Sequence, residues 1–176
     1  MESVETPLGR IKFEAMVSGN TKIKMLDLPC TLSNGMTLDR VVACVLVVEP
    51  DVDGVALTFT AHLDNESLSG SPESGECLDC VSWESSNWAL SLGTEDADAL
   101  SQRLKCFDIE SGEYPISYSG SGLELRLAGL DRGEALSFHF IVAYKRLPDS
   151  RECSTWFAVD VPHHELANKA MHATSA

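Results

Sequence analysis

Residues 55–63 have the sequence VALTFTAHL, and residues 136–144 have the sequence LSFHFIVAY. In both stretches, large apolar side chains occupy every second position, which is the period of a β-strand with one buried and one exposed face. The two stretches recur among other short apolar runs that are separated by turn residues. This pattern favours an all-β fold.

Further strands are expected wherever a short apolar run lies between turn residues. The expected segments are 9–13, 22–28, 40–48, 77–83, 88–92, 104–109, 114–118, 123–127 and 155–161. The nearly continuous apolar run in 40–48 predicts a central strand that is buried on both faces. The turn 50–54 ends in Asp-Gly, which predicts that 55–63 folds back on 40–48 as a hairpin. Residues 65–75 are rich in serine and glycine and predict a loop.

Only one convincing helix is expected before the C-terminal tail, over 95–103, with Thr94 as its N-cap and basic residues at its end. Because strands follow one another without βαβ alternation, the sequence predicts an antiparallel β-sandwich of the jelly-roll type. A chain of 176 residues can bury one two-layer core. We expect a single domain over 1–162 and a tail, 163–176, that frays or forms a short helix.

The formal net charge is −14, and residues 49–113 hold fifteen Asp or Glu against two basic residues, Arg103 and Lys105. A surface this acidic is repelled by phosphate backbones, so the chain alone is not expected to bind nucleic acid. Solubility is the alternative explanation of the acidity. No stretch has the length of a membrane span, and residues 1–9 lack the apolar region of a secretory signal. We therefore expect a cytosolic protein with reduced cysteines.

The cysteines are irregularly spaced and occupy positions Cys30, Cys44, Cys77, Cys80, Cys106 and Cys153. Cys44 lies within an apolar run, which predicts a buried thiol. Cys77 and Cys80 form a Cys-x-x-Cys pair, but a structural zinc site needs four ligands. Cys106, Cys153 and His62 would have to converge on the pair. A redox pair normally begins a helix, whereas this one lies in a predicted strand with Asp79 between the thiols. Incidental or structural cysteines are favoured, and metal and redox roles stay open.

Two other constellations resemble metal sites. Residues 49–54 begin like a calcium loop, but the twelfth position, which should be a bidentate Glu, is Thr60 within a predicted strand. A turn is therefore favoured. His163 and His164 precede a glutamate, but no second histidine completes a His-Glu-x-x-His helix. The other histidines are His62 and His139, which lie on the polar phase of their strands and are expected to face solvent or a neighbouring strand, and His172.

No catalytic motif is present. Residues 120–122 predict a flexible turn, and the chain lacks a nucleophile elbow, a phosphate-binding loop and a dinucleotide fingerprint. The tryptophans Trp83, Trp88 and Trp156 are expected to pack in the core. We predict that the protein is not an enzyme, and the sequence assigns no catalytic, cofactor-binding or metal-binding residue and no cofactor.

Three stretches resemble viral jelly-roll coat proteins. Residues 53–65, DGVALTFTAHLDN, resemble the glycine-led third strand of capsid subunits. Residues 121–130 followed by 135–144 resemble late strands of plant picorna-like coat protein domains, the como-, nepo- and cheravirus group. Residues 156–162, WFAVDVP, resemble a last capsid strand that leaves the sandwich. These viruses build shells without basic N-terminal arms, and this chain has none.

The resemblance implies a structural subunit of an icosahedral capsid, present in the virion and the host cytoplasm. Its partners would be other copies of itself or sibling coat proteins in a high-order oligomer. It would contact viral RNA only indirectly and no membrane.

Three other hypotheses stay open. The glycine-led strand that ends in Asp64 is similar to one in viral movement proteins of the thirty-kilodalton superfamily, which bind nucleic acid and are longer and more basic. A soluble β-sandwich binding module, such as an inhibitor or immunity protein, would use its acidity to cap a basic partner. A metal-dependent enzyme would be built around Cys77, Cys80 and nearby histidines.

Overall fold

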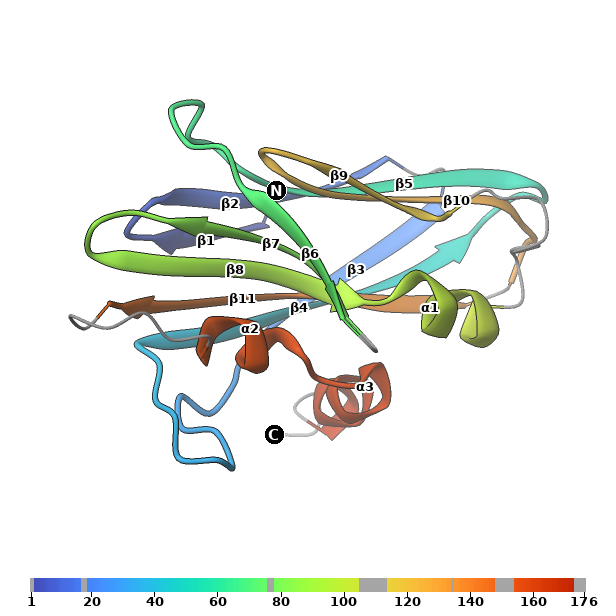
Figure 1. The fold of residues 1–176 in the computed structure, drawn as a ribbon. Helices are drawn as coiled ribbons and strands as arrows, with labels where there is room; N and C mark the ends of the chain where they lie inside the picture. The colour runs from blue at the N-terminus through green and yellow to red at the C-terminus, as the bar shows by residue number, and fades with distance from the viewer. Residues whose placement is uncertain are drawn as a thin grey trace.

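The computed structural model describes residues 2–16, 19–75, 78–104, 114–133, 135–147 and 154–172. It is a β-sandwich of two antiparallel sheets packed face to face, which confirms the predicted fold class (Figure 1). Sheet A has the order β1 (Glu2–Thr6), β2 (Gly9–Met16), β5 (Val55–Leu63), β10 (Gly122–Leu130) and β9 (Ile116–Ser119). Sheet B has the order β3 (Gly19–Asp27), β4 (Arg40–Pro50), β11 (Leu136–Arg146), β8 (Trp88–Glu95), β7 (Leu78–Glu84) and β6 (Ser71–Gly75). The helices are α1 (Ala97–Leu104), α2 (Ser154–Val159) and α3 (His163–His172).

The main core lies between the two sheets and is formed by the alternating side chains that the sequence predicted. Phe59 of β5 contacts Phe138 of β11 in an edge-to-face pair with ring centroids 4.2 Å apart. Phe13 of β2 lies 6.1 Å from Phe140 of β11, centroid to centroid. All four rings are fully buried, so they join the centres of the two sheets.

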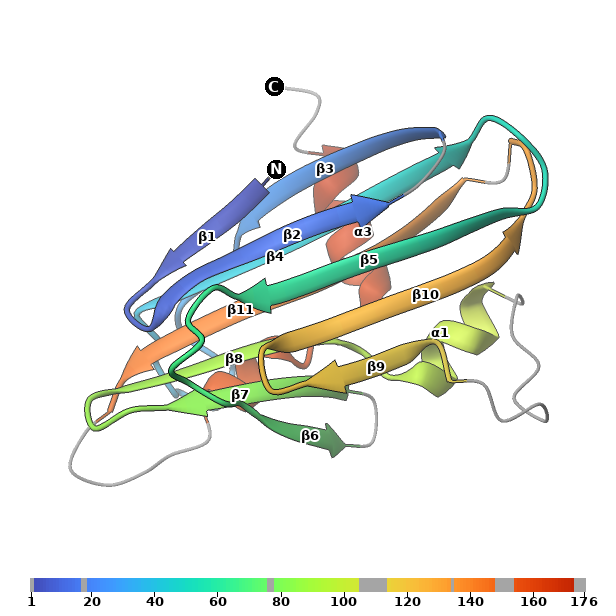
Figure 2. The ribbon, with the colours of Figure 1, turned by 90° about the horizontal axis from the view of Figure 1, so that it is seen from above.

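The outer faces of the two sheets differ. On sheet B, a second apolar cluster lies on the side away from sheet A and includes Val41, Val45 and Ile141. Helices α2 and α3 cover this cluster, and Leu166 of α3 is fully buried in it (Figure 1). Among the described residues, no helix lies over the outer face of sheet A (Figure 2). The molecule therefore has one covered and one open sheet.

The predicted hairpin between residues 40–48 and 55–63 is wrong. Strand β4 pairs with β3 and β11 in sheet B, whereas β5 pairs with β2 and β10 in sheet A. Both edges of β4 are occupied, so β5 cannot add to it. The turn instead passes from one sheet to the other, with Gly54 at a positive φ of 69° (Figure 2).

The predicted helix over 95–103 is present as α1, but it begins two residues later. Thr94 and Glu95 belong to β8, and the Thr94 hydroxyl donates to the carbonyl of His139 at 2.7 Å. The N-cap is Asp96, whose side chain accepts a hydrogen bond from the Ala99 N–H at 2.6 Å. Thr94 cannot cap the helix because it lies within β8 and its hydroxyl already donates to the carbonyl of His139.

Two other segments differ from the expected pattern. The segment 155–161, expected as a strand, forms helix α2 over Ser154–Val159. Strand β11 already pairs on both sides, so the remaining apolar segment covers the sheet instead of extending it. Within the expected loop 65–75, Ser71–Gly75 forms the edge strand β6. Pro72 is tolerated there because an edge strand leaves one row of backbone groups unpaired.

The C-terminal segment, expected to fray or form a short helix, forms α3 as far as His172. The expected strand 104–109 lies outside the described residues apart from Leu104, which ends α1. None of the described helices has the length and apolar character needed to cross a lipid bilayer. The division into 1–162 and a tail, and the jelly-roll type, stay predictions.

Candidate functional site

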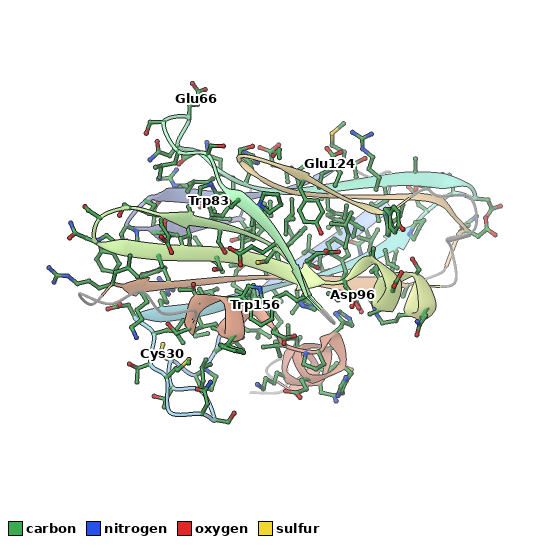
Figure 3. All side chains as sticks on the ribbon, viewed as in Figure 1. Cys30, Glu66, Trp83, Asp96, Glu124 and Trp156 are labelled. Carbon is green, nitrogen blue, oxygen red and sulfur yellow. The ribbon has the colours of Figure 1, made fainter. Side chains whose placement is uncertain are left out.

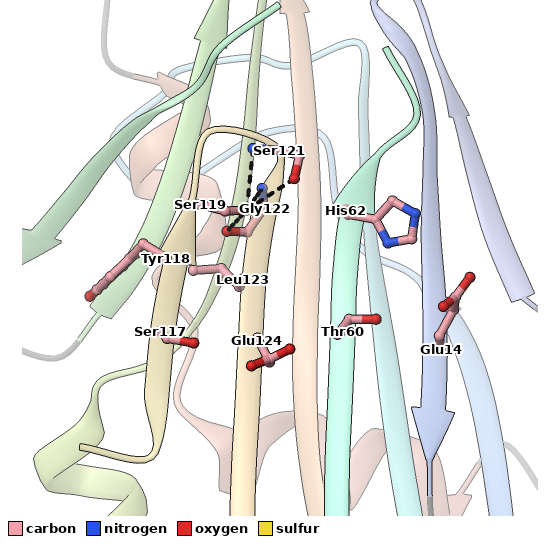
Figure 4. Close-up of a pocket in the computed structure, with 10 residues that line it drawn as sticks. All are labelled: Glu14, Thr60, His62, Ser117, Tyr118, Ser119, Ser121, Gly122, Leu123 and Glu124. Atoms are coloured by element: carbon pink, nitrogen blue, oxygen red, sulfur yellow. Dashed lines mark hydrogen bonds between the residues drawn. The ribbon is translucent and has the colours of Figure 1, made fainter. Parts of the chain in front are cut away.

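The open face of sheet A carries a groove that crosses β2, β5, β10 and β9, with a volume of about 500 Å³ (Figure 4). The strand register places Glu14 opposite Thr60, Thr60 opposite Glu124, and Glu124 opposite Ser117. These residues form one polar row across the sheet, because side chains directly opposite each other share a face. The groove therefore has two carboxylates separated by a threonine.

A second row beside the first is hollowed by a glycine. It contains Lys12, His62, Gly122 and Ser119 in register. Gly122 is required because a Cβ at this position would overlap the backbone oxygen of Ala61. The lack of a side chain between His62 and Ser119 opens the groove at this point (Figure 4).

The charges on this face are partly neutralised by ion pairs. Lys12 lies 3.3 Å from Asp64, and Arg126 lies 2.5 Å from Glu124. The pKa of Asp64 is lowered, first by the hydrogen bond from the Arg10 backbone N–H and then by Lys12. Glu14 makes no ion pair with any residue that the structure describes. It is therefore the carboxylate most available to a ligand in the groove.

The predicted turn at residues 120–122 joins β9 to β10 at one end of the groove. Its N–H groups are already used within the turn, since the Ser119 hydroxyl accepts from Ser121 N–H at 3.3 Å and Gly122 N–H at 3.1 Å (Figure 4). This end of the groove does not form a phosphate cradle.

A second polar site is buried on the covered side of sheet B. Glu95 of β8, His139 of β11 and His163 of α3 are all buried, and one potential ligand atom from each lies within 4.8 Å of the others. The Nδ1 atoms of the two histidines are 3.0 Å apart, and the rings stack. Nε2 of His163 lies 2.9 Å from the Ser137 hydroxyl. Arg103 of α1 forms an ion pair with Glu95, with its Nε 3.2 Å from Oε2.

Burial decides the charge of this histidine pair. It lowers the pKa of His139 to about 3, with contributions from His163 and Arg103. It lowers the pKa of His163 to about 4, and Arg103 contributes here too. Both rings are therefore neutral at neutral pH, and one ring donates its Nδ1–H to the Nδ1 lone pair of the other.

The sequence predicted that His139 faces solvent or a neighbouring strand, but it did not predict that this side chain is buried under a helix. His139 does face β8, but it is fully buried because α3 covers this face of sheet B. The sequence held one signal: Ile141 and Ala143, on the same phase of the strand as His139, are apolar. A strand that is apolar on both phases is normally covered on both faces. His62, in contrast, lies on the open face of sheet A and is half-buried.

The alternative of a metal site around the Cys77–Cys80 pair can be followed only at Cys80 and His62, and these two residues lie on different sheets. Cys80 is buried in β7 of sheet B, whereas His62 lies on β5 of sheet A. Burial raises the pKa of the Cys80 thiol to about 12, which opposes thiolate formation. Cys77, Cys106 and Cys153 lie outside the described residues. The prediction that Cys44 is buried is confirmed.

Residues 51–54 form a turn between strands β4 and β5, whereas a calcium loop of the EF-hand type is flanked by helices. The Asp53 carboxylate accepts the backbone N–H of Arg132 at 2.9 Å, which fastens this turn to the turn after β10. Thr60 lies in the middle of β5, on the open face.

The tryptophans pack as predicted. Trp83 is buried between the sheets, and its indole N–H donates to the carbonyl of Gly120 at 3.1 Å (Figure 3). Trp88 packs against the same core, and Trp156 packs against the outer cluster under the helices (Figure 3). They do not form an exposed binding platform.

Comparison with known proteins identified no relative: no protein-family model matches the chain, and no curated protein or solved structure matches it. Function is therefore inferred from the geometry of the described residues.

Proposed function

We propose that this protein is a non-catalytic β-sandwich module that binds a basic partner protein on the open face of sheet A. The observation that carries the proposal is the groove on this face, in which Glu14 and Glu124 flank Thr60. The opposite sheet is covered by helices, so sheet A offers the larger uncovered strand surface. Glu14 and Glu124 lie two strands apart, about 10 Å at the backbone, so each carboxylate can pair with a different lysine or arginine side chain of one basic segment.

The net negative charge of the whole chain, like the carboxylates of the groove, favours binding of a basic partner. A net charge of −14 attracts a basic protein and accelerates its approach, particularly at low ionic strength. The acidic residues of 49–113 that the structure describes are spread over both sheets, their loops and α1, so this attraction does not by itself select a face. The groove supplies the short-range contacts that select the site. Glu124 exchanges its exposed partner Arg126 for the cation of the ligand at little cost, because exposed ion pairs contribute little.

The test measures binding of a fluorescent peptide rich in arginine and lysine, with a glutamine-substituted peptide as reference, at low and physiological salt. The double variant Glu14→Gln/Glu124→Gln should bind the basic peptide at least about tenfold more weakly than the wild type. Its matched control is Glu66→Gln/Asp160→Asn, which removes the same charge from exposed loop positions. Equal losses in both double variants would show unspecific attraction to an acidic protein and would contradict the proposed site.

The capsid hypothesis is a second proposal, supported by an apolar feature at one end of the sandwich. Met16, at the end of β2, is 73% exposed, and Val52, in the turn from β4 to β5, is 51% exposed. Met16 lies opposite Thr58, near the start of β5, so both residues lie toward the end at which the chain passes from sheet B to sheet A. Methionine is enriched in interfaces between proteins relative to the rest of the surface.

Assembly is tested by light scattering and negative-stain imaging of the purified chain, alone and with any sibling chains encoded beside it. Closed shells or stable rings that are lost in Met16→Ser/Val52→Ser would support the capsid proposal. A monomer under both conditions would contradict it and would leave the binding-module proposal unaffected.

A further inference from the structure

The buried polar site on sheet B lies apart from the groove on sheet A, and its side chains have no role in the proposed binding of a basic partner. The ladder between β8 and β11 ends with Gly93 opposite Ile141, and Glu95 and His139 lie two residues beyond these positions on their strands. Their potential ligand atoms lie within 4.8 Å of each other. His163, the first residue of α3, lies over this pair. Three elements that are far apart in the sequence therefore each contribute one metal-binding side chain.

The two histidines are spaced like ligands of one ion. Their Nδ1 atoms are 3.0 Å apart. Two nitrogens bound to a tetrahedral Zn²⁺ at its usual bond length are separated by about 3.3 Å. An ion can therefore take the place of the proton between the two Nδ1 atoms, with a small movement of either side chain, when that proton moves to Nε2 of the ring that carried it.

One polar atom in the site lacks a partner. Nε2 of His139 is buried and forms no hydrogen bond within the part of the chain that the structure describes. Buried polar atoms in folded proteins are nearly always paired, and an exception indicates a missing water or ion. His139 thus has two candidate ligand atoms: Nδ1, which faces His163, and the unpartnered Nε2.

The surroundings of the histidines match those of a metal site. Metal-binding histidines usually donate their second N–H to a neighbouring oxygen, which holds the ring in place. Ser137 has this relation to His163, with the hydroxyl 2.9 Å from Nε2.

We infer that Glu95, His139 and His163 bind one divalent transition-metal ion, with Zn²⁺ as the expected occupant, and that the ion fastens α3 to sheet B. Two imidazoles and one carboxylate favour Zn²⁺ and its neighbours over Ca²⁺ or Mg²⁺, which prefer oxygen ligands. Three protein ligands leave a fourth position for water. This inference is independent of the proposed function, because the groove lies on the other sheet.

Arg103 should lower the affinity of the site for a metal ion. Its guanidinium pairs with the Glu95 carboxylate and therefore competes with a cation for the same oxygens. The Arg103 side chain is 28% exposed, so it can turn toward solvent when an ion binds. Removal of this positive charge should strengthen metal binding, whereas it would only weaken a purely structural ion pair.

The experiment titrates Zn²⁺ into the chelator-treated full-length protein by calorimetry and records the visible absorption of the Co²⁺ form. The wild type should bind one ion per chain, with a tetrahedral Co²⁺ spectrum and a higher thermal unfolding midpoint at saturating Zn²⁺. His163→Asn and Glu95→Gln should each weaken Zn²⁺ binding at least about a hundredfold. His164→Asn, which alters the exposed neighbouring histidine, is the matched control and should bind like the wild type.

Arg103→Met keeps the inference testable if a ligand variant does not fold, because it should bind Zn²⁺ roughly tenfold more tightly than the wild type. Absence of stoichiometric binding in both the wild type and Arg103→Met would overturn the inference. It would also be overturned if Zn²⁺ binding persisted in folded His163→Asn but was lost in Cys77→Ser, because the ion would then belong to the cysteines.

Discussion

Cys44 and Cys80 lie on opposite faces of sheet B, the first in the core between the sheets and the second in the cluster under the helices. Burial raises the pKa of both thiols to about 12, and Ser82 opposes this rise only partly at Cys80. Because the thiolate is the reactive form, only about one thiol in ten thousand is ionised at pH 8 when the pKa is about 12. Both residues act as small apolar side chains rather than as nucleophiles.

We therefore predict that Cys44 and Cys80 are alkylated by iodoacetamide at pH 8 far more slowly in the folded protein than in urea. The measurement is a time course followed by peptide mass spectrometry, which reports each cysteine separately. Cys30, which is only partly buried, is the internal control and should react first. Rapid labelling of Cys80 in the folded protein would contradict its position in the outer cluster.

Residue-scale predictions from sequence were correct where neighbours along the chain decide the environment. Cys44 is surrounded by apolar residues in its own strand, so its burial followed from the local pattern. His139 also belongs to an alternating strand, but its burial depends on α3, which begins at His163. The partner of a buried polar residue cannot be predicted from the period of one strand.

At the scale of elements, Asp79 joins three parts of the fold. This carboxylate of β7 accepts hydrogen bonds from the Tyr118 hydroxyl of β9 and from the Ala97 N–H at the start of α1. Strand β9 belongs to sheet A and β7 to sheet B, so the contact links the two sheets beside α1. Burial is the main cause of the raised pKa of Asp79, and it also raises the pKa of Tyr118.

We predict that Asp79→Asn and Tyr118→Phe each lower the free energy of unfolding by about 1 kcal/mol, with a coupling of at least about 0.5 kcal/mol between them. A double-mutant cycle in urea measures both quantities. Asp98→Asn, an exposed change in the first turn of α1, is the control for loss of negative charge. Strict additivity of the two changes would contradict the Tyr118–Asp79 hydrogen bond.

The same variant tests the pH dependence of stability. The folded pKa of Asp79 is raised above the unfolded value of about 4, so the folded state binds this proton more tightly than the unfolded state. The stabilisation from this group is complete below the unfolded pKa and is lost as the pH rises through the folded pKa. Asp79→Asn should remove this loss, which urea titrations at a series of pH values would detect.

Errors in predicting the elements had one common cause. The hairpin between 40–48 and 55–63 failed because a turn sequence reports a change of direction but not which sheet the next strand joins. Segment 155–161 is apolar enough for a strand, but it forms α2 because both sides of β11 are taken by β4 and β8. In both cases the deciding neighbours are distant in the sequence.

At the scale of the whole molecule, the two sheets differ in how deeply their strands are buried. β4 and β11 are covered by sheet A on one face and by helices or the outer apolar cluster on the other. β6 and β9 are short edge strands of five and four residues. Edge strands protected by their shortness or by proline avoid unwanted pairing with other chains.

We predict that backbone amides of β4 and β11 exchange with deuterium only through global unfolding, and that those of β6 and β9 exchange at least about a hundredfold faster. Hydrogen exchange with peptide-level mass spectrometry would measure this difference. Equal protection of all strands would contradict a molecule with one doubly covered sheet.

The architecture was more predictable than either candidate site. The alternation of 55–63 and 136–144 predicted one core-facing side for each strand, and this followed from local periodicity. The second face of 136–144, which the pattern predicted to be exposed, is buried in the outer cluster. The groove depends on the register of β2, β5, β10 and β9, and the buried histidine site depends on a helix that lies over a sheet. Neither arrangement can be predicted from one strand or helix alone, because each depends on contacts between segments that are distant in the sequence.

The position of β11 has a consequence for synthesis on the ribosome. It is the last of the described strands along the chain, and it lies between β4 and β8 in the middle of sheet B. Until it emerges, β3–β4 and β6–β8 are two separate pieces, each with an apolar edge strand that lacks its neighbour. Both edges therefore stay unpaired until β11 has emerged, and unpaired strand edges of this kind are prone to aggregate.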